Sequence, residues 1–321
     1  MGKILSCVGS MLLAEEKVMA NPFHEGELAV QRRAANGDMG ERVGAGIRPI
    51  LSSMAQRFLS RQYMLIVSSV DSCGRLWTSF LSGEPGFIQI GDLQHLRIAA
   101  HELPGDPLWE NLREHEAVGL LAIELETRLR LRINGRAHIE KDASITIDTE
   151  QVYFNCPRFI QQRALVLEAL ERKEVSHIQR SEGLTQEQQS WVRRADTLFI
   201  SSFHERGGAD ASHRGGEPGF VRVVDASRLL LPDYAGNGMF QTLGNILVNP
   251  HVGLLIPDFA TGSTLQITGR ASIIWDEERI AALPGAERLL EITIDEVVQR
   301  DAILPWRWQL IEPSPYNFPL A

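Results

Sequence analysis

The sequence predicts a mainly β protein with flanking helices, an α+β chain built from two fused copies of one strand-rich unit. Four short blocks recur in the same order at a nearly constant spacing. Short apolar runs also end repeatedly in turns that contain Gly and Pro, which is typical of antiparallel strands in a barrel or sandwich. At 321 residues the chain is long enough to bury the cores of two small domains.

Comparison of the chain with itself defines the repeat. Four segments return 133 or 134 residues later: 65–69, 83–87, 118–121 and 131–137. The block at 83–87, GEPGF, is identical to its copy at 216–220. A single repeat of this length indicates a duplicated domain, since solenoid repeats are far shorter. We expect the copies to pack as a pseudo-twofold pair, as the subunits of an ancestral homodimer would.

Composition changes along the chain predict five parts. We expect an N-terminal helical extension over 1–58, a first copy over 59–145, a helical connector over 146–194, a second copy over 195–290 and a C-terminal tail over 291–321. Within the extension, the apolar spacing predicts a helix over 25–35. The glycine-rich stretch 37–46 is expected to be a loop.

Charge and composition exclude several classes of protein. The net charge of −9 argues against nucleic acid as a partner, because phosphate backbones require a basic face. No apolar run approaches the roughly 20 residues of a membrane-spanning helix. The three cysteines, Cys7, Cys73 and Cys156, form no metal-binding pattern and indicate a reducing, cytoplasmic location.

The N-terminus matches a lipidation pattern. Met1-Gly2 followed by Ser6 fits N-myristoylation, and Cys7 could accept a second lipid. The alternative is the amphipathic start of a helix, which we favour because so short a motif often matches by chance.

The two copies differ in their polar residues. Asp210 and Arg214 stand where the first copy has Trp77 and Leu81. Phosphate prefers Arg together with hydroxyl and amide donors, and glycine allows close backbone approach. We therefore expect a single phosphate site on the second copy, formed by Ser212, Arg214, Gly215, Asn237, Thr242 and Asn245. Asp210 is expected to orient Arg214; the alternative is a purely structural ion pair between the two.

These blocks together resemble one known family. The blocks are Asp210-x-Ser212-x-Arg214-Gly215-Gly216, Pro232-Asp233-x-x-Gly236-Asn237, 242–250 (TLGNILVNP), 265–271 (LQITGRA) and the N-terminal 23–27 (FHEGE). They are similar to the FMN-binding split-barrel superfamily of pyridoxamine 5′-phosphate oxidase-like proteins, in particular to its tandem members. The resemblance implies two tandem split β-barrels with FMN in the cleft between them.

The resemblance also implies roles for the first copy. Trp77 and Ser79 are expected to face the isoalloxazine ring across the cleft, although Trp77 could equally be a core residue. The substrate-phosphate signature of the true pyridoxamine phosphate oxidases is missing from the sequence, so oxidation of vitamin B6 is not implied.

The function that the resemblance implies is an FMN-dependent oxidoreductase acting on a small-molecule substrate. NAD(P)H is a candidate electron donor and a homodimer a candidate assembly. No protein acid or base stands out as catalytic, because the cofactor carries the redox chemistry. One alternative is a non-catalytic flavin-binding or sensor protein. Another is a protein of the same fold that uses a deazaflavin or haem, with His213 as the haem ligand.

Overall fold

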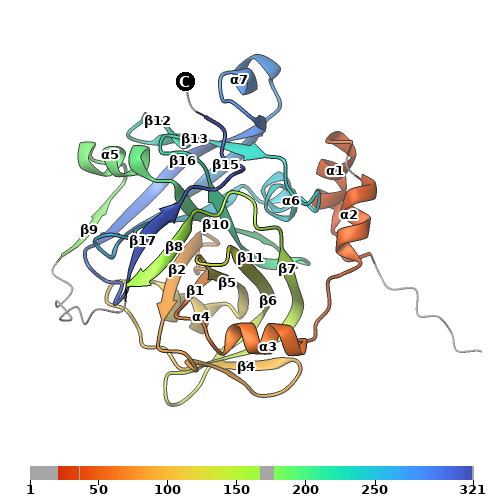
Figure 1. The fold of residues 1–321 in the computed structure, drawn as a ribbon, viewed down its shortest axis with the longest axis vertical. Coiled ribbons are helices and arrows are strands. Elements are labelled where there is room, and N and C mark those ends of the chain that lie inside the picture. Colours follow the sequence, from red (N-terminus) through yellow and green to blue (C-terminus); the bar gives the residue numbers. More distant parts are fainter. Residues whose placement is uncertain (1–20, 36, 167–176, 320–321) are drawn as a thin grey trace, which may run out of the picture.

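The computed structural model describes residues 21–35, 37–166 and 177–319. Its described residues form two large antiparallel sheets packed against each other and one two-stranded sheet, with helices at the periphery (Figure 1). The lipidation pattern at residues 1–7 lies outside the described residues. No helix among the described residues is long and apolar enough to cross a membrane.

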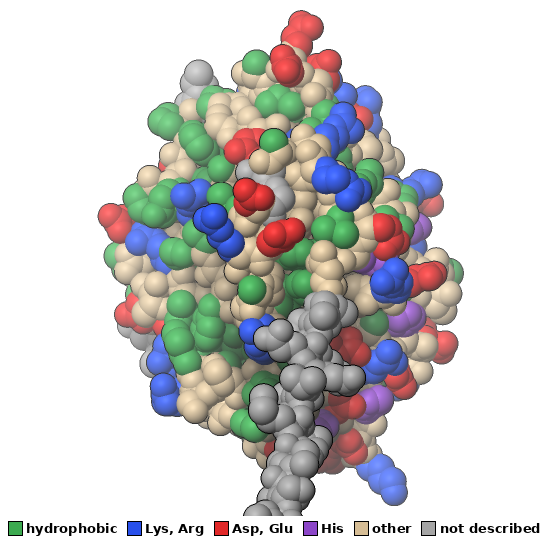
Figure 2. Space-filling view, turned by 90° about the vertical axis from the view of Figure 1, so that its right-hand side faces the viewer, with side chains coloured by type: hydrophobic (Ala, Val, Ile, Leu, Met, Phe, Trp, Pro, Cys, Tyr) green, Lys and Arg blue, Asp and Glu red, His purple; other side chains and the backbone are tan. Residues whose placement is uncertain are grey.

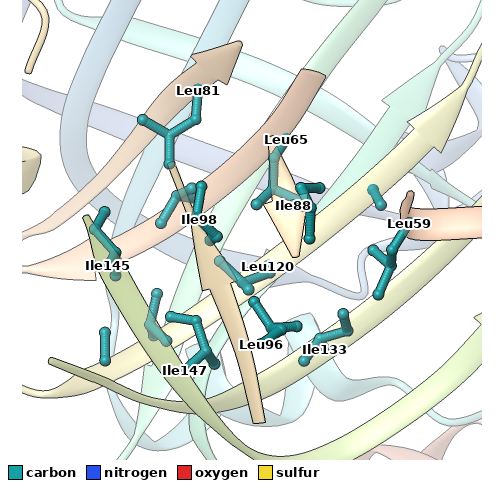
Figure 3. Packing of buried hydrophobic residues seen from close by; sticks show 14 of the residues in the cluster. Leu59, Leu65, Leu81, Ile88, Leu96, Ile98, Leu120, Ile133, Ile145 and Ile147 are labelled. Atoms are coloured by element: carbon teal, nitrogen blue, oxygen red, sulfur yellow. The ribbon is translucent and has the colours of Figure 1, made fainter. Parts of the chain in front are cut away.

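The first half is a seven-stranded sheet with strand order β2-β1-β5-β6-β7-β4-β3. Its elements are β1 (Met64–Val70), β2 (Leu76–Ser82), β3 (Ile88–Ile90), β4 (His95–Ile98), α4 (Leu108–Glu114), β5 (Ala117–Glu124), β6 (Leu129–Ile139) and β7 (Ile145–Asn155). Alternate side chains of these strands point inward and form one apolar core, in which Leu65, Leu81 and Ile98 are each at most 1% exposed (Figure 3).

The second half repeats the first strand for strand. Its elements are β10 (Thr197–His204), β11 (Gly208–Gly215), β12 (Arg222–Asp225), β13 (Arg228–Tyr234), α6 (Gln241–Val248), β14 (His251–Asp258), β15 (Ser263–Ile274), α7 (Glu277–Ala281) and β16 (Ala286–Arg300). The order β11-β10-β14-β15-β16-β13-β12 is that of the first sheet. The predicted mainly β fold, built from two copies of one unit, is confirmed.

The identical GEPGF blocks form the same turn in both halves. Gly86 and Gly219 each have a φ of 96° and each directly follows a Pro, as in a type II turn. The Phe amide at the end of each block donates to the Glu carbonyl at 2.9 Å. This block therefore builds the fold and does not distinguish the two copies.

Matching glycines bring the halves together. A Cβ on Gly119 of β5 would lie 2.7 Å from the backbone of Asp210 in the other half. A Cβ on the corresponding Gly253 of β14 would lie 2.8 Å from the carbonyl oxygen of Leu76. β11 of the second half thus packs on Gly119, and β2 of the first half packs on the equivalent Gly253. This reciprocal contact is the arrangement of a pseudo-twofold pair. Phe80, Leu121, Phe199 and Leu255 lie in the apolar cluster between them.

The described part of the N-terminal extension, residues 21–35 and 37–58, is helical at a stretch predicted to be a loop. It contains α1 (Glu25–Arg33), α2 (Gly37–Gly44) and α3 (Ser53–Leu59), so the helix at 25–35 is confirmed and the loop at 37–46 is wrong. The glycines of α2 allow close packing: a Cβ on Gly44 would lie 2.5 Å from the ring of Phe23. Acidic and basic side chains are interspersed on the face that carries α1 and α2 (Figure 2).

The helical connector predicted over 146–194 is mostly wrong. β7 continues to Asn155, and the connector contains the strands β8 (Gln162–Val166) and β9 (Ile178–Ser181) before α5 (Gln186–Arg194). β8 pairs with β17 (Arg307–Glu312), and β9 pairs with β16. These partners are distant in sequence, so local apolar spacing could not reveal them. The second half extends to Arg300 and not only to residue 290, since β16 pairs with β15 up to that residue.

Candidate functional site

A pocket of about 110 Å³ lies where the two halves meet. The first half supplies β6 and the segment that follows β7. The second half supplies the end of β11, the connection from β13 to α6 and the first turn of α6. The pocket is therefore complete only when both halves are present.

Five of the residues predicted to bind phosphate line this pocket. They are Ser212, Arg214, Gly215, Asn237 and Thr242. Ser212 and Arg214 project from the same face of β11 because they are two residues apart on a strand. The hydroxyls of Ser212 and Thr242 are 3.0 Å apart, so β11 and α6 meet at the floor of the pocket.

The predicted partnership of Asp210 and Arg214 is wrong. Asp210 is buried and pairs with Arg132 of the first half at 2.7 Å. Arg214 pairs instead with Asp233 of β13 at 3.0 Å. Asp210 and Arg214 are four residues apart on the same face of β11. Each pairs with a side chain outside β11: Arg214 across the sheet with Asp233, and Asp210 across the junction with Arg132.

Gly215 is required by the chain itself. A Cβ at this position would lie 2.1 Å from the carbonyl oxygen of Phe159, which follows the first half. The close approach that the glycine permits is thus an approach of protein backbone. The sequence predicted that Gly215 allows the backbone to approach a phosphate; the structure shows the approach of Phe159, and the phosphate contact stays a prediction.

Three predicted residues lie away from the pocket. Asn245 accepts a hydrogen bond from the His24 ring at 2.8 Å and donates to the Ser202 hydroxyl at 3.0 Å. Trp77 donates through its indole nitrogen to Asp71 at 3.1 Å. Ser79 donates to Asp106 at 2.7 Å. Trp77 and Ser79 lie on β2, which the pseudo-twofold axis places at the other, related end of the junction, so they do not face the same cleft as Arg214.

The pocket carries a surplus of positive charge. Four arginines line it: Arg130, Arg132, Arg158 and Arg214. Arg132 and Arg214 have carboxylate partners, whereas no carboxylate among the described residues forms an ion pair with Arg130 or Arg158. Burial and the neighbouring charge of Arg132 lower the pKa of Arg130 to about 9. An anion in the pocket would relieve this repulsion.

Aromatic side chains form the rest of the wall. The rings of Phe159 and Tyr234 stack with their centroids 4.8 Å apart, and Phe220 and Phe240 also line the pocket. Guanidinium groups beside aromatic rings suit a ligand that has both an anionic group and a planar ring.

The related position at the other end of the junction is filled by the protein itself. There the Asp106 carboxylate accepts from Ser79 and lies 2.7 Å from the Arg300 guanidinium and 3.2 Å from the Gln266 amide. Ser79 and Gln266 correspond in the repeat to Ser212 and Arg132. The Asp106 and Arg300 side chains are at most 1% exposed. The Asp106 carboxylate thus occupies the hydrogen-bond donors Ser79, Gln266 and Arg300 at this end of the junction.

His213 is among the residues that line the pocket, but its side chain is not grouped with those of Ser212 and Arg214. It lies on the strand face opposite to Ser212 and Arg214, and its ring packs edge-on against Phe199 at 5.8 Å. Burial, together with Arg130 and other nearby arginines, holds its pKa well below the usual range. This orientation does not favour the haem alternative.

A second cluster has the composition of a metal site but not its chemistry. His24, Glu25 and His204 lie close enough together to hold an ion. The Nδ1 atom of His24 accepts from a backbone amide at 3.1 Å, and that of His204 accepts from two. Each ring therefore carries its proton on Nε2 and donates, to Asn245 and Glu25 respectively. A neutral imidazole protonated at Nε2 has no lone pair there for a metal.

Sequence reasoning missed the residues that the first half supplies. Arg130, Arg132, Arg158 and Phe159 were not predicted, although the repeat contained one signal. Alignment of 131–137 with 265–271 places Arg132 opposite Gln266, a charge present in the first copy alone.

The fold and the pocket define a class of protein: a duplicated antiparallel split barrel with an arginine-lined pocket at the junction of its halves. Residues 184–305 match the family model described as pyridoxamine 5′-phosphate oxidase. Over its second half the chain therefore belongs to the pyridoxamine 5′-phosphate oxidase-like split-barrel superfamily. No curated protein sequence matches the chain.

Solved structures align with about one barrel's length of the chain. A protein described as a putative pyridoxamine 5′-phosphate oxidase from Lactobacillus delbrueckii is 18% identical, with 36% of this chain and 94% of that chain covered and a TM-score of 0.30. An FAD-binding protein from Mesorhizobium loti is 14% identical, with 39% and 97% covered and a TM-score of 0.28. HupZ from Group A Streptococcus is 13% identical, with 35% and 89% covered and a TM-score of 0.29. Scores this low carry no argument about function.

Proposed function

We propose that this chain is an FMN-dependent oxidoreductase that acts on a small organic substrate in the pocket between its two halves. The observation that carries the proposal is the unbalanced charge of the pocket, where Arg130 and Arg158 have no carboxylate partner among the residues that the structure describes. The family match over residues 184–305 supports a flavin as the ligand.

The residues present fit a flavin phosphate. The guanidinium groups of Arg130, Arg158 and Arg214 would hold the phosphate, with the hydroxyls of Ser212 and Thr242 as further donors. Buried donor atoms without a partner, the Nε of Arg130 and of Arg214, lie in the same wall. Donors in such surroundings cost free energy unless an acceptor reaches the site.

The protein's own part in the reaction is binding and orientation. When bound, FMN would supply the two-electron redox chemistry. The aromatic wall of Phe159 and Tyr234 would hold a planar ring and exclude water, and the arginines would fix the anionic end. Arg132 is held by Asp210 and would keep its charge, because Asp210 and Tyr153 raise its pKa even though burial lowers it.

The absorbance spectrum of the purified protein tests the cofactor. We expect the bands of an oxidised flavin, or their appearance when FMN is added and the excess removed. A Soret band without flavin bands would overturn the proposal in favour of haem. A protein that binds neither FMN nor haem in titration would overturn it as well.

A second measurement separates an enzyme from a sensor. The flavin-loaded protein is mixed anaerobically with NADPH or NADH, and the loss of the oxidised flavin band is followed. Reduction that is reversed by an added electron acceptor supports an oxidoreductase. A bound flavin that neither nicotinamide nor dithionite-reduced mediators can turn over would support a non-catalytic flavin-binding protein instead.

A further inference from the structure

The C-terminal segment 313–319 packs beside the wall of the pocket. Its anchor is Gln161, which is 1% exposed and follows the pocket residues Arg158 and Phe159. The Gln161 side-chain oxygen accepts from the Ser314 amide at 2.7 Å and from the Asn317 side chain at 3.0 Å. β17, which leads into this segment, pairs with β8, which follows Gln161 (Figure 1).

Gln161 also joins the segment to the second half. Its side-chain nitrogen donates to the carbonyl oxygens of Phe159 and Gly216, each at 3.2 Å. The Asn317 amide donates to Glu217 at 3.0 Å. One buried side chain thus ties together the wall of the pocket, the GEPGF turn and the C-terminal segment.

Phe159 has a backbone conformation that needs outside support. Its φ is 66°, in the left-handed region that a bulky residue rarely adopts. Such conformations cost free energy and persist only where surrounding contacts hold them. Here the Phe159 carbonyl is held by Gln161, and its ring packs in a three-ring cluster with Tyr234 at 4.8 Å and Phe318 at 6.2 Å, which are themselves 5.1 Å apart.

Arg158 is supported from the same side. Its guanidinium lies 5.4 Å from the ring centre of Tyr316, a cation–π contact, and donates at 3.4 Å to the carbonyl of Ala235. The two pocket residues of the connector, one charged and one aromatic, are thus both contacted by the C-terminal segment.

We propose that segment 313–319 positions Arg158 and Phe159 and thereby sets the affinity of the pocket for its ligand. The inference rests on the proposed function, since the ligand is taken to be FMN. Gln161, Tyr316 and Phe318 act as positioning residues through the wall of the pocket. Coupling of this kind is reciprocal: the ligand must steady the segment as much as the segment favours the ligand.

The test compares three full-length variants with the unaltered protein. Phe318→Ala should weaken FMN binding about tenfold, as typical couplings between sites do. Phe318→Tyr should restore it, because the stacking surface is kept. Ile311→Ala is the matched control: it changes an exposed apolar residue of the neighbouring β17, 57% exposed, and should leave FMN affinity unchanged. Affinity is measured by quenching of FMN fluorescence.

Hydrogen exchange tests the physical cause, first without ligand and then with bound FMN. In Phe318→Ala the amides of 156–161 should exchange faster than in the unaltered protein, and bound FMN should slow exchange over 313–319 in the latter. Unchanged affinity in Phe318→Ala, or faster exchange without loss of affinity, would overturn the inference. If the unaltered protein binds no FMN, it is the proposed function that fails, and the exchange at 156–161 still decides whether the segment positions the wall.

Discussion

Arg214 can be removed without leaving its partner unpaired. Asp233 also accepts from Arg288, at 2.9 Å, so the buried carboxylate keeps one guanidinium. We predict that Arg214→Ala lowers FMN affinity by about tenfold to a hundredfold, the worth of one or two charge-assisted hydrogen bonds, with little change in thermal stability. Fluorescence titration and thermal melting measure the two effects.

The control for Arg214 is Arg228→Ala. Arg228 is an exposed arginine of β13 that pairs with Asp225 at the surface. Leu81, the repeat counterpart of Arg214, would be a poor control because its truncation leaves a cavity in the core of the first half. Equal FMN affinity in the Arg214 and Arg228 variants would show that the phosphate does not bind in this pocket.

Glu27 makes stability depend on pH in an unusual direction. Burial, with Asp210 nearby, raises its pKa from 4.5 to about 8. A carboxyl group with a raised pKa stabilises the fold when protonated, so its contribution is full below about pH 4.5 and is lost as the pH rises through 8. We predict that Glu27→Gln, which keeps the acceptor for the His24 amide, raises the melting temperature at pH 8 and above but not at pH 4.5.

The measurement is the melting temperature of Glu27→Gln and of the unaltered protein between about pH 4.5 and 8. The difference between the two melting temperatures should grow steadily as the pH rises through this range. A constant difference, or one that shrinks with rising pH, would mean that Glu27 is ionised in the folded protein.

Helices α1 and α6 approach so closely that only glycine fits between them. A Cβ on Gly244 would lie 2.5 Å from the backbone nitrogen of Glu27, and one on Gly26 would lie 2.2 Å from the Gly244 carbonyl oxygen. Because these obstacles are backbone atoms, the helices must move apart. We predict that Gly244→Ala destabilises the protein by about 1–3 kcal/mol in denaturant unfolding, the usual cost of overpacking.

The matched substitution is Gly236→Ala. The nearest atom to a Cβ there is 3.9 Å away, an ordinary van der Waals distance, so stability should change little. If both alanine variants unfold at the same denaturant concentration as the unaltered protein, the α1–α6 contact is looser than described.

At the level of elements, the sequence predicted strands that carry a local signal and missed strands whose partners are distant. β1 and β10, which contain the repeated block 65–69 and its copy, were predicted from apolar runs bounded by turns, because those signals are local. β8 and β9 were read as helix, since their partners β17 and β16 are more than 100 residues away. Pairing over such a distance leaves no periodic trace in the sequence.

The whole molecule is a duplication in which one junction position is open and the other closed. Asp106 and Arg300 form the closed position, both fully buried. We predict that Asp106→Ala destabilises the protein by about 3–5 kcal/mol, because it leaves the Arg300 charge buried without a partner. FMN should still bind to the variant, at the distant pocket, with unchanged affinity.

A double variant separates charge from packing. Adding Arg300→Met to Asp106→Ala removes the uncompensated charge, so the double variant should be more stable than the single one. Titration calorimetry of the unaltered protein should give one FMN per chain. Two FMN per chain would show that the Asp106 position also accepts ligand.

The sequence by itself determined the duplication, the mainly β class and half of the pocket. Repeated blocks and turns are local features, and residues such as Ser212, Arg214 and Thr242 were visible because the copies differ there. The tertiary structure alone decided that Arg130, Arg132 and Arg158 complete the pocket and that Asp210 faces Arg132. The physical reason is the pseudo-twofold packing of the halves. It places β11 of the second copy beside β6 of the first and places β2 at the opposite end of the junction, and no local sequence pattern encodes this contact between the copies.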